Sequence, residues 1–434
     1  MIENKTIKRL IKIIAILGIF PKYRRYIRTK MLQHTTLCWN YISKIITNRN
    51  YRKILKTIYL KDKIKVGFLV SENSKWNCQS LYDELEKHPY FEPIILITRV
   101  KQLHDGYSSF YDDIEDNKKF FTKKGLRFQV AYDIQSKKYI PLKKFECDII
   151  FYQQPWWLHS NQQILKTSYT ALTAYVPYCF HMLEEENNYF EHFHKILWCY
   201  FVESKLYEKK YKEIYNATNI VYSGHTKLDN YLSNTHKKNT KPTIIYAPHH
   251  LNCDNHLFLT WEWNGKEILE FAKKNNQYHW IFKPHPHFKD SLIRNNILTL
   301  TDMDTYFEEW NKVGEICLSG DYYNLFKSSA CLITDCISFL AEYMPTKSPV
   351  IFLKANEQKA PFTDLGEIIT RNYYKVHTWS EFIDIFNRVI IQNDDYLKNE
   401  RLNDLTYLID TPQQSAAKKI VNYLEKLLKQ PLIK

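Results

Sequence analysis

The stretch WIFKPHPH, residues 280–287, joins an apolar run to three basic side chains that are separated by two prolines. Its aromatic and β-branched residues are typical of a buried strand. Proline has no backbone N–H, so the pairing of this strand must end where the prolines begin. Ligands of open α/β sheets bind at the carboxyl ends of the strands, and Lys283, His285 and His287 are therefore predicted to line a binding site. A rigid basic turn without a function is the alternative.

Strands and helices alternate on both sides of this stretch. Strand-like runs lie at 64–70, 93–99, 147–154, 173–180, 196–202, 219–224, 243–248, 278–284, 330–335 and 348–354. Helical patterns lie at 74–88, 109–124, 204–217 and 264–276, from 337, and at 379–392, 395–408 and 413–430. A polar segment at 230–242 separates two halves. The pattern predicts an α/β fold of two Rossmann-like domains, with parallel sheets, that face a cleft.

The basic character of the chain is concentrated at its start. Residues 1–65 carry 17 of the 61 lysines and arginines and 2 of the 47 acids, and the remainder holds 44 bases against 45 acids. Ile7, Ile11 and Ile14 share one helical face, opposite basic residues. The apolar run is too short to cross a bilayer. We expect 1–62 to be a basic helical segment on an anionic membrane surface; packing on the protein's own body and an RNA-binding arm are alternatives.

Glycine and cysteine usage narrows the chemistry. The 9 glycines form neither G-x-G-x-x-G nor a P-loop, so side chains and helix ends would have to bind any phosphate. The 9 cysteines show no C-x-x-C pair and no zinc spacing, and we expect them to be reduced thiols of a cytosolic protein. No basic, aromatic-interleaved platform follows the first 65 residues, which argues against nucleic acid as a partner.

A second predicted strand end lies in LITDCISFLAE, residues 332–342. Thr334 and Asp335 close the strand, and a helix from about residue 337 would direct backbone N–H groups toward an anion. Ser338 and Glu342 are one turn apart on one face of that helix. The hydroxyl suits a phosphate and the carboxylate suits ribose hydroxyls; an ordinary helix cap with a solvated glutamate is the alternative.

A third strand end, IIYAPHH at 244–250, finishes in His249 and His250. With His285, these side chains are predicted to hydrogen-bond a diphosphate. Adjacent histidines chelate one ion poorly, and no carboxylate stands at ligand spacing. The D-x-D pattern at 302–304 is equally typical of a helix cap. We therefore assign no metal and no other cofactor.

Two strand ends of the first half carry aromatic residues. They are FYQQPWWLHS at 151–160 and YVPYCFH at 175–181. Aromatic side chains at such positions stack on sugars or polyols, and they pack in cores equally often. The first stretch contains His159, and the second ends at His181.

The motifs IIYAPHH, FKPHP, GDYYNLFKSSACLITDCISFLAEY and SPVIFL resemble, in order and approximate spacing, those of the CDP-glycerol glycerophosphotransferase family. That family includes teichoic-acid primases and polymerases and relatives found with capsule and lipopolysaccharide genes. The resemblance is specific over about 220–355 and thin before it. The sequence departs from the family's pattern in three places: Leu251 aligns with the family's arginine, Glu342 replaces an aspartate, and the N-terminal H-G motif has no clear equivalent.

The resemblance implies a GT-B fold and an enzyme that is peripheral at the inner, cytoplasmic face of the cell membrane. Residues 63–235 would be the acceptor domain, and residues 236–434, terminal helices included, the nucleotide-donor domain. A glycerol phosphate or similar polyol phosphate would pass from a CDP-linked donor to a hydroxyl of a lipid-linked or polymeric, teichoic-acid-like acceptor, with release of CMP.

The resemblance also assigns roles to side chains. Donor binding is predicted for His249, His250, Lys283, His285, Thr334, Asp335, Ser338 and Glu342. Catalysis is predicted for His285, with His181 or His159 as a substitute for the missing base. Two other functions remain open: a GT-B glycosyltransferase that uses a nucleotide sugar for capsule or lipopolysaccharide synthesis, and a non-catalytic binding protein of polymer assembly.

Overall fold

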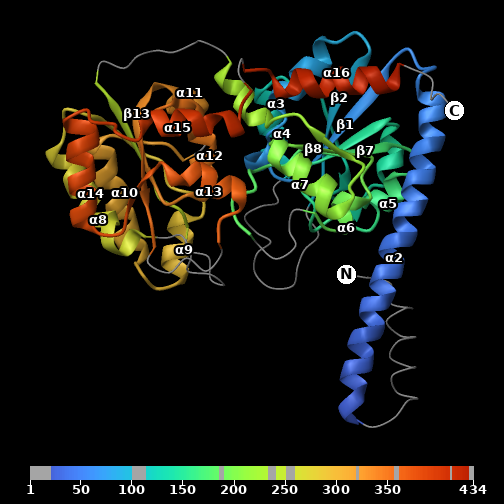
Figure 1. Cartoon of the computed structure of the whole chain (residues 1–434), viewed down its shortest axis with the longest axis horizontal. Coiled ribbons are helices and arrows are strands. Elements are labelled where there is room, and N and C mark those ends of the chain that lie inside the picture. The colour runs from blue at the N-terminus through green and yellow to red at the C-terminus, as the bar shows by residue number, and fades with distance from the viewer. Residues whose placement is uncertain are drawn as a thin grey trace.

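The computed structural model describes residues 21–99, 114–184, 190–232, 241–250, 260–318, 322–355, 361–410 and 413–429. It describes the backbone from residue 21 and side chains from residue 38. The predicted amphipathic face around Ile7, Ile11 and Ile14 lies outside the described residues. The described chain folds into two parallel sheets, each flanked by helices (Figure 1).

The first sheet has seven strands in the order β3-β2-β1-β6-β7-β8-β9, and all of its pairs are parallel. Its strands are β1 (Ile64–Val70), β2 (Phe91–Ile97), β3 (Phe128–Val130), β6 (Ile149–Tyr152), β7 (Leu172–Tyr175), β8 (Cys199–Val202) and β9 (Ile220–Tyr222). Its helices are α3 (Gln79–Lys87), α4 (Ile114–Lys123), α5 (Ile164–Thr167), α6 (His192–Lys195) and α7 (Lys205–Tyr215). A small antiparallel pair, β4 (Tyr132–Asp133) and β5 (Lys138–Tyr139), stands apart.

The second sheet has six strands in the order β12-β11-β10-β13-β14-β15, again all parallel. Its strands are β10 (Thr243–Ala247), β11 (His279–Phe282), β12 (Glu315–Ile316), β13 (Ser329–Thr334), β14 (Val350–Leu353) and β15 (Tyr374–Val376). Its helices are α8 (Trp261–Lys274), α9 (Phe288–Arg294), α10 (Leu300–Val313), α11 (Tyr323–Ser328), α12 (Ile337–Tyr343), α13 (Asp364–Arg371), α14 (Trp379–Phe386) and α15 (Lys398–Asp404).

The prolines act on the second sheet as the sequence predicts. β11 ends at Phe282, directly before Lys283, and β10 ends at Ala247, directly before Pro248. The two strands and β13 run parallel, so their carboxyl ends meet at one edge of the sheet. The predicted α/β fold with parallel sheets is confirmed.

Several boundaries differ from the sequence prediction. The helix expected over 74–88 begins only at Gln79, because residues 73–75 form a separate 3-10 turn. The 302–304 stretch lies inside the first turn of α10, where Asp302 completes a capping box with Thr299. β3, β12 and β15 were not predicted, since strands of two or three residues carry too little periodicity to be recognised.

The two halves share a core and direct contacts. One hydrophobic cluster contains Met182 and Tyr200 of the first half together with Phe352 and Leu365 of the second. Backbone bonds join Thr363 to Met182 (3.0 Å) and Glu184 to Pro361 (2.9 Å). The chain also returns: α16 (Ala416–Leu428), which the sequence placed with the second domain, packs on α3 and on the core of the first sheet (Figure 1). Its apolar face, which includes Ile420 and Leu424, is buried there.

The long helix α2 (Pro21–Ile58) packs on the first sheet only over its C-terminal part and then extends away from the body (Figure 1). Tyr51 is buried, and its hydroxyl lies 2.6 Å from Thr173 Oγ1 and donates to the Ile196 carbonyl at 2.8 Å. Asn50 donates to Ser168 Oγ at 3.1 Å. Of the helices in the described residues, none has the length and hydropathy that crossing a bilayer requires.

Asp229 ties the return helix to the linker between the halves, and its loss should destabilise the protein. Its carboxylate accepts the backbone N–H groups of Ala416 (2.7 Å) and Ala417 (2.9 Å) and the Ser415 hydroxyl (3.1 Å). We expect Asp229→Ala to lower the free energy of unfolding by about 1–2 kcal/mol, because two backbone N–H groups in the first turn of α16 lose their acceptor. Chemical denaturation followed by circular dichroism measures this.

Asp302→Ala is the matched control for this experiment, since Asp302 caps α10 from an exposed position. A smaller loss is expected for the control, because water can replace an exposed cap. Equal losses in the two variants would contradict a special role for Asp229.

Candidate functional site

Four histidines gather at the carboxyl edge of the second sheet, as the sequence predicts. The ring centroids of His249 and His250 are 4.4 Å apart, and those of His250 and His285 are 4.1 Å apart and stacked. His249 and His285 are separated by 4.9 Å between centroids. His287 lies at the margin, 5.4 Å from His285 and 5.7 Å from His250. All four rings are partly buried.

Asp335 fixes the backbone of this cluster, and both of its carboxylate oxygens accept hydrogen bonds from within the protein. Its side chain is buried, and Oδ1 accepts the His249 backbone N–H at 2.6 Å. Oδ2 accepts both the backbone N–H (2.7 Å) and the hydroxyl (2.9 Å) of Thr260, just before α8. Burial raises the pKa of Asp335 to about 6, and these hydrogen bonds oppose the rise. Asp335, predicted to bind the donor, is a positioning residue in this structure.

Thr334 is likewise used inside the protein. It is buried, its hydroxyl donates to the Ala247 carbonyl at 2.6 Å, and it accepts the Cys336 N–H at 2.9 Å. These bonds fix the ends of β10 and β13 side by side. Ser338, in the first turn of α12, is exposed instead. Of the two hydroxyls predicted to meet a donor, Ser338 is the accessible one.

Lys283 directly follows β11, two residues before His285, and is almost wholly buried. Its Nζ lies 4.7 Å from the ring centroid of Tyr322 and 5.5 Å from that of Phe339. Burial lowers its pKa below the ordinary value for lysine, and nearby groups including Glu342 oppose the shift. The ammonium group is thus surrounded by aromatic faces, which stabilise a cation without neutralising it.

Glu342, predicted to bind ribose hydroxyls, joins the two halves instead. Lys227, in the turn after β9, donates to Oε1 at 2.6 Å. Oε2 accepts the Tyr323 hydroxyl at 3.0 Å and also the Tyr322 hydroxyl. The carboxylate is 1% exposed, so a donor could reach it only by displacing these partners.

The histidine cluster is neutral near pH 7. Burial, the largest cause, lowers the pKa of His249 to about 4 and that of His250 to about 3. Burial together with the neighbouring histidines holds the pKa of His285 well below its usual range. Desolvation thus selects the neutral form of these imidazoles.

The two candidate bases of the first half lie in other surroundings. His181 is buried, with Nδ1 3.0 Å from Glu203 Oε1 and its carbonyl accepting the hydroxyls of Tyr207 (2.7 Å) and Thr363 (2.6 Å). His159 stacks on Tyr139 at 4.1 Å between centroids. Among the contacts described for the two residues, none reaches the histidine cluster.

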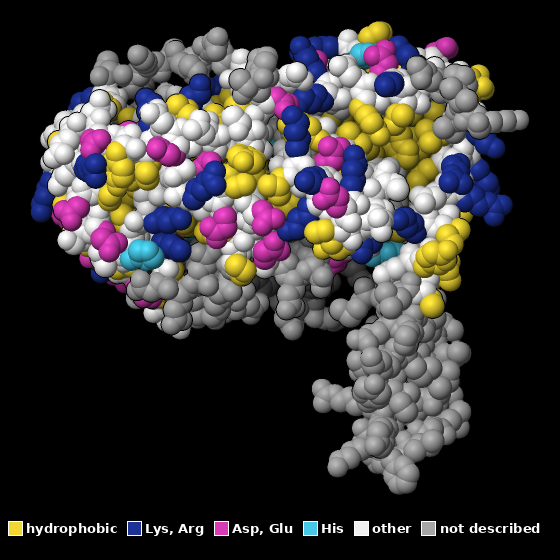
Figure 2. Space-filling view, viewed as in Figure 1, with side chains coloured by type: hydrophobic (Ala, Val, Ile, Leu, Met, Phe, Trp, Pro, Cys, Tyr) yellow, Lys and Arg dark blue, Asp and Glu magenta, His cyan; other side chains and the backbone are white. Residues whose placement is uncertain are grey.

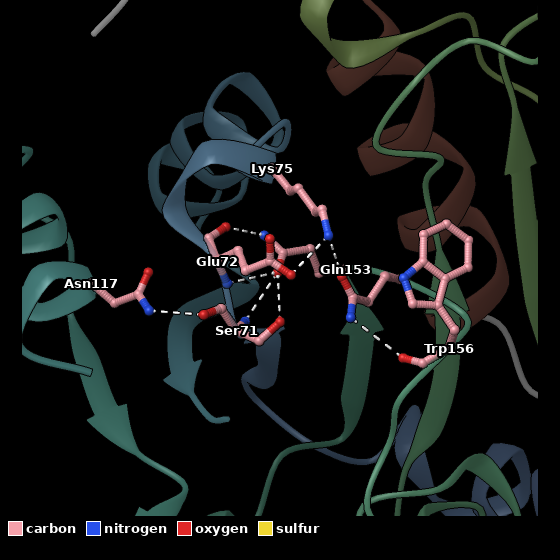
Figure 3. A network of polar contacts seen from close by, with 7 residues as sticks. Ser71, Glu72, Lys75, Asn117, Gln153 and Trp156 are labelled. Carbon is pink, nitrogen blue, oxygen red and sulfur yellow. Dashed lines mark hydrogen bonds and ion pairs between the residues drawn. The ribbon is translucent and has the colours of Figure 1, made fainter. Parts of the chain in front are cut away.

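A polar network occupies the carboxyl edge of the first sheet (Figure 3). Gln153, at the end of β6, accepts the backbone N–H groups of Ser71 (3.0 Å) and Glu72 (3.1 Å) and donates to the Glu72 carbonyl at 2.7 Å. Asn117 of α4 donates to the Ser71 carbonyl at 2.9 Å. Lys75 Nζ donates to Glu72 Oε1 at 2.7 Å, and burial raises the pKa of Glu72. The turn after β1 is therefore held rigidly.

Lys75 also links this network to aromatic side chains. Its Nζ donates a hydrogen bond to Gln154 Oε1 at 3.1 Å. The same atom lies 5.8 and 5.6 Å from the ring centroids of Trp157 and Tyr178. Burial, the largest cause, lowers the pKa of His287, and the charge of Lys75 is a smaller contributor. The sequence flagged the tryptophans, but Lys75 lies in a short 3-10 turn that carries no motif.

The amino-acid sequence was compared with known families. Residues 185–423, more than half of the chain, match the family described as CDP-glycerol:poly(glycerophosphate) glycerophosphotransferase. A stretch of 145 residues is 28% identical to the minor teichoic acid biosynthesis protein GgaB of Bacillus subtilis. This match covers 32% of the chain and 14% of GgaB, so the chain corresponds to a small part of that protein.

Solved structures share the fold at low identity. The wall teichoic acid polymerase TagF (H444N variant) matches over 95% of this chain and 99% of its own, with a TM-score of 0.53 and 12% identity.

 A UDP-N-acetylglucosamine 2-epimerase (putative) from Listeria monocytogenes matches over 86% of this chain and 99% of its own, with a TM-score of 0.57 and 13% identity. These likenesses show the fold alone, and they confirm the GT-B-like architecture of two facing α/β halves.

The family match spans the strand ends at which Lys283, His285 and Ser338 lie, and it extends through the joint made by Lys227 and Glu342 into α16. The quoted motifs and the whole second sheet lie inside the residues that match the family. The chain belongs to the CDP-glycerol:poly(glycerophosphate) glycerophosphotransferase family.

Proposed function

We propose that this protein transfers a polyol phosphate, glycerol phosphate or a close relative, from a CDP-linked donor to a hydroxyl of a teichoic-acid-like acceptor and releases CMP. The observation that carries the proposal is the arrangement of Lys283, His285 and Ser338 at one sheet edge, inside the residues that match the family. A buried lysine, an imidazole and an accessible hydroxyl suit the phosphate oxygens of such a donor.

The transfer itself needs little covalent chemistry from the protein. The acceptor oxygen bonds to the phosphorus next to the polyol, and its proton passes to water. The bond from that phosphorus to the CMP oxygen breaks, and CMP leaves with the electron pair. His285 Nδ1 accepts the His287 backbone N–H at 3.2 Å, so the neutral ring carries its proton on Nε2. We assign to this Nε2–H a hydrogen bond to the donor's phosphate, with Lys283 supplying positive charge behind it.

Donor identity is the first test, by thermal shift with a panel of nucleotide-linked compounds and by CMP release. We expect CDP-glycerol or CDP-ribitol to raise the melting temperature and, with an acceptor, to yield CMP. His285→Ala should reduce CMP release at least about 100-fold, as loss of a transition-state hydrogen-bond donor does. His279→Ala is the matched control, because His279 begins the same strand at its opposite end.

Each other outcome points to a different function. Stabilisation by a nucleotide sugar, and not by any CDP-polyol, would replace the proposal with a glycosyltransferase. Full polymer production in cells that carry His285→Ala would replace it with a non-catalytic binding protein.

For the acceptor, we propose the surface around Lys75 and Trp157. Trp157 is 40% exposed and has a left-handed backbone conformation (φ 58°), which is strained for a bulky side chain. Two rings, Trp157 and Tyr178, lie beside the lysine ammonium, and Trp156 packs edge-on against both. An aromatic face suits the C–H groups of a polyol or sugar, and an ammonium suits a phosphodiester of the same chain.

Acceptor binding should therefore depend on this aromatic surface and donor binding should not. We expect Trp157→Ala to raise the KM for a poly(glycerol phosphate) acceptor roughly 10-fold, equivalent to about 1.4 kcal/mol, and to leave CDP-glycerol affinity unchanged. Steady-state kinetics with separately varied substrates measures both. Tyr169→Ala, an exposed aromatic residue outside this cluster, is the control. A change in donor affinity alone would contradict the assignment.

For the location, we propose attachment to the inner membrane surface through α2. Where this helix leaves the body, Tyr41, Ile42 and Ile45 are 70%, 46% and 51% exposed, and Figure 2 shows hydrophobic side chains gathered there. Lys44 and Arg49 lie beside them in the sequence. Apolar side chains next to bases are what an anionic bilayer surface binds.

Removal of these apolar side chains should weaken membrane binding. We expect Ile42→Ser with Ile45→Ser to lower the partition onto vesicles that contain phosphatidylglycerol about 10-fold or more, since two isoleucine side chains no longer leave water. Sedimentation with vesicles measures this. Ile214→Ser, at an exposed isoleucine of α7, is the control. Equal sedimentation of both variants would show that α2 does not carry the attachment.

A further inference from the structure

We propose that His249, His250 and His285 form a binding site for a divalent transition-metal ion, Zn²⁺ foremost. One ring nitrogen from each of the three lies within 4.8 Å of those from the other two. Among the described residues, these three histidines form the one group of three or more potential metal-ligating side chains whose ligand atoms lie this close together. Two of the three are adjacent in the chain, which is why spacing alone argued against a metal.

The cluster is built on a fixed backbone. Asp335 holds the His249 N–H, and the His285 N–H donates to the Pro248 carbonyl at 2.9 Å. The strand ends therefore present the rings together before any ion binds. Such prior positioning by neighbouring groups is what lets a site select its metal.

The nitrogens are suited to a metal in two of the three rings. His249 Nδ1 lies 2.9 Å from the His250 carbonyl, and because a carbonyl only accepts, Nδ1 carries the proton and Nε2 keeps its lone pair. His250 Nδ1 is buried and has no hydrogen-bond partner in the described structure. His285 offers Nδ1 by giving up the 3.2 Å bond from the His287 N–H, a bond at the long limit of the range.

The ligand type indicates which ion would bind. Neutral imidazoles favour zinc and its transition-metal neighbours, whereas Mg²⁺ and Ca²⁺ favour oxygen ligands. Three histidines leave a fourth position of Zn²⁺ open. On the proposed function, that position would face the donor's phosphates and would supply charge that the neutral rings lack; metal binding itself does not depend on that function.

The test measures metal binding with no donor present, so it is separate from the test of the proposed function. The full chain, stripped with a chelator, is titrated with ZnCl₂ and with MgCl₂ by calorimetry, and with CoCl₂ by visible absorption. We expect one equivalent of Zn²⁺, a tetrahedral Co²⁺ spectrum and no Mg²⁺ binding. His250→Gln and His285→Gln should each weaken Zn²⁺ binding roughly 100-fold or more, and His279→Ala should leave it unchanged.

The melting temperature and circular dichroism of each variant show whether it is folded. Absence of Zn²⁺ binding by the native chain would overturn the proposal. Unchanged binding by both folded glutamine variants would overturn it too, because the ion would then sit elsewhere, for example at the exposed Cys38 thiol.

Discussion

The buried carboxylate of Asp335 is the constraint on which the site depends. A charged group that is 1% exposed is costly unless donors surround it, and here three do so: two backbone N–H groups and the Thr260 hydroxyl. Those donors come from the loop after β10 and from the start of α8, whereas Asp335 follows β13. One carboxylate thus fixes the relative positions of three elements and sets the direction in which His249 and His250 leave the sheet.

The protonation state of the four histidines determines whether this edge of the sheet binds an anion through charge or through neutral hydrogen-bond donors. Four cationic imidazoles within a few ångströms of one another would repel strongly in a partly buried position, and burial removes their charge instead. Positive charge at the second sheet comes from Lys283, whose ammonium lies over the rings of Tyr322 and Phe339. The neutral imidazoles can donate hydrogen bonds to a diphosphate, and Lys283 supplies one positive charge. A divalent ion bound to the imidazoles would supply further charge to the diphosphate.

The sequence predicts the framework of the site better than its contacts. Apolar runs that end in proline located β10 and β11, and the edge at which Lys283 and His285 meet, because proline acts locally on backbone pairing. The role of Asp335 was not readable, since its partners lie 75 and 86 positions away along the chain. The same limit applies to His181, whose contact with Glu203 is visible only after two strands have packed.

Two residues that the sequence predicted to act on substrate, Glu342 and His181, instead make buried contacts between the two halves. Glu342 receives Lys227 from the linker, and the His181 carbonyl receives Thr363 from the second half. Gly366 packs so closely there that an added Cβ would lie 2.2 Å from the Met182 carbonyl oxygen. Rotation of one sheet against the other must therefore break charged and backbone contacts, and not only separate apolar surfaces. The relative positions of the two sheets are for that reason set by the fold before any substrate arrives.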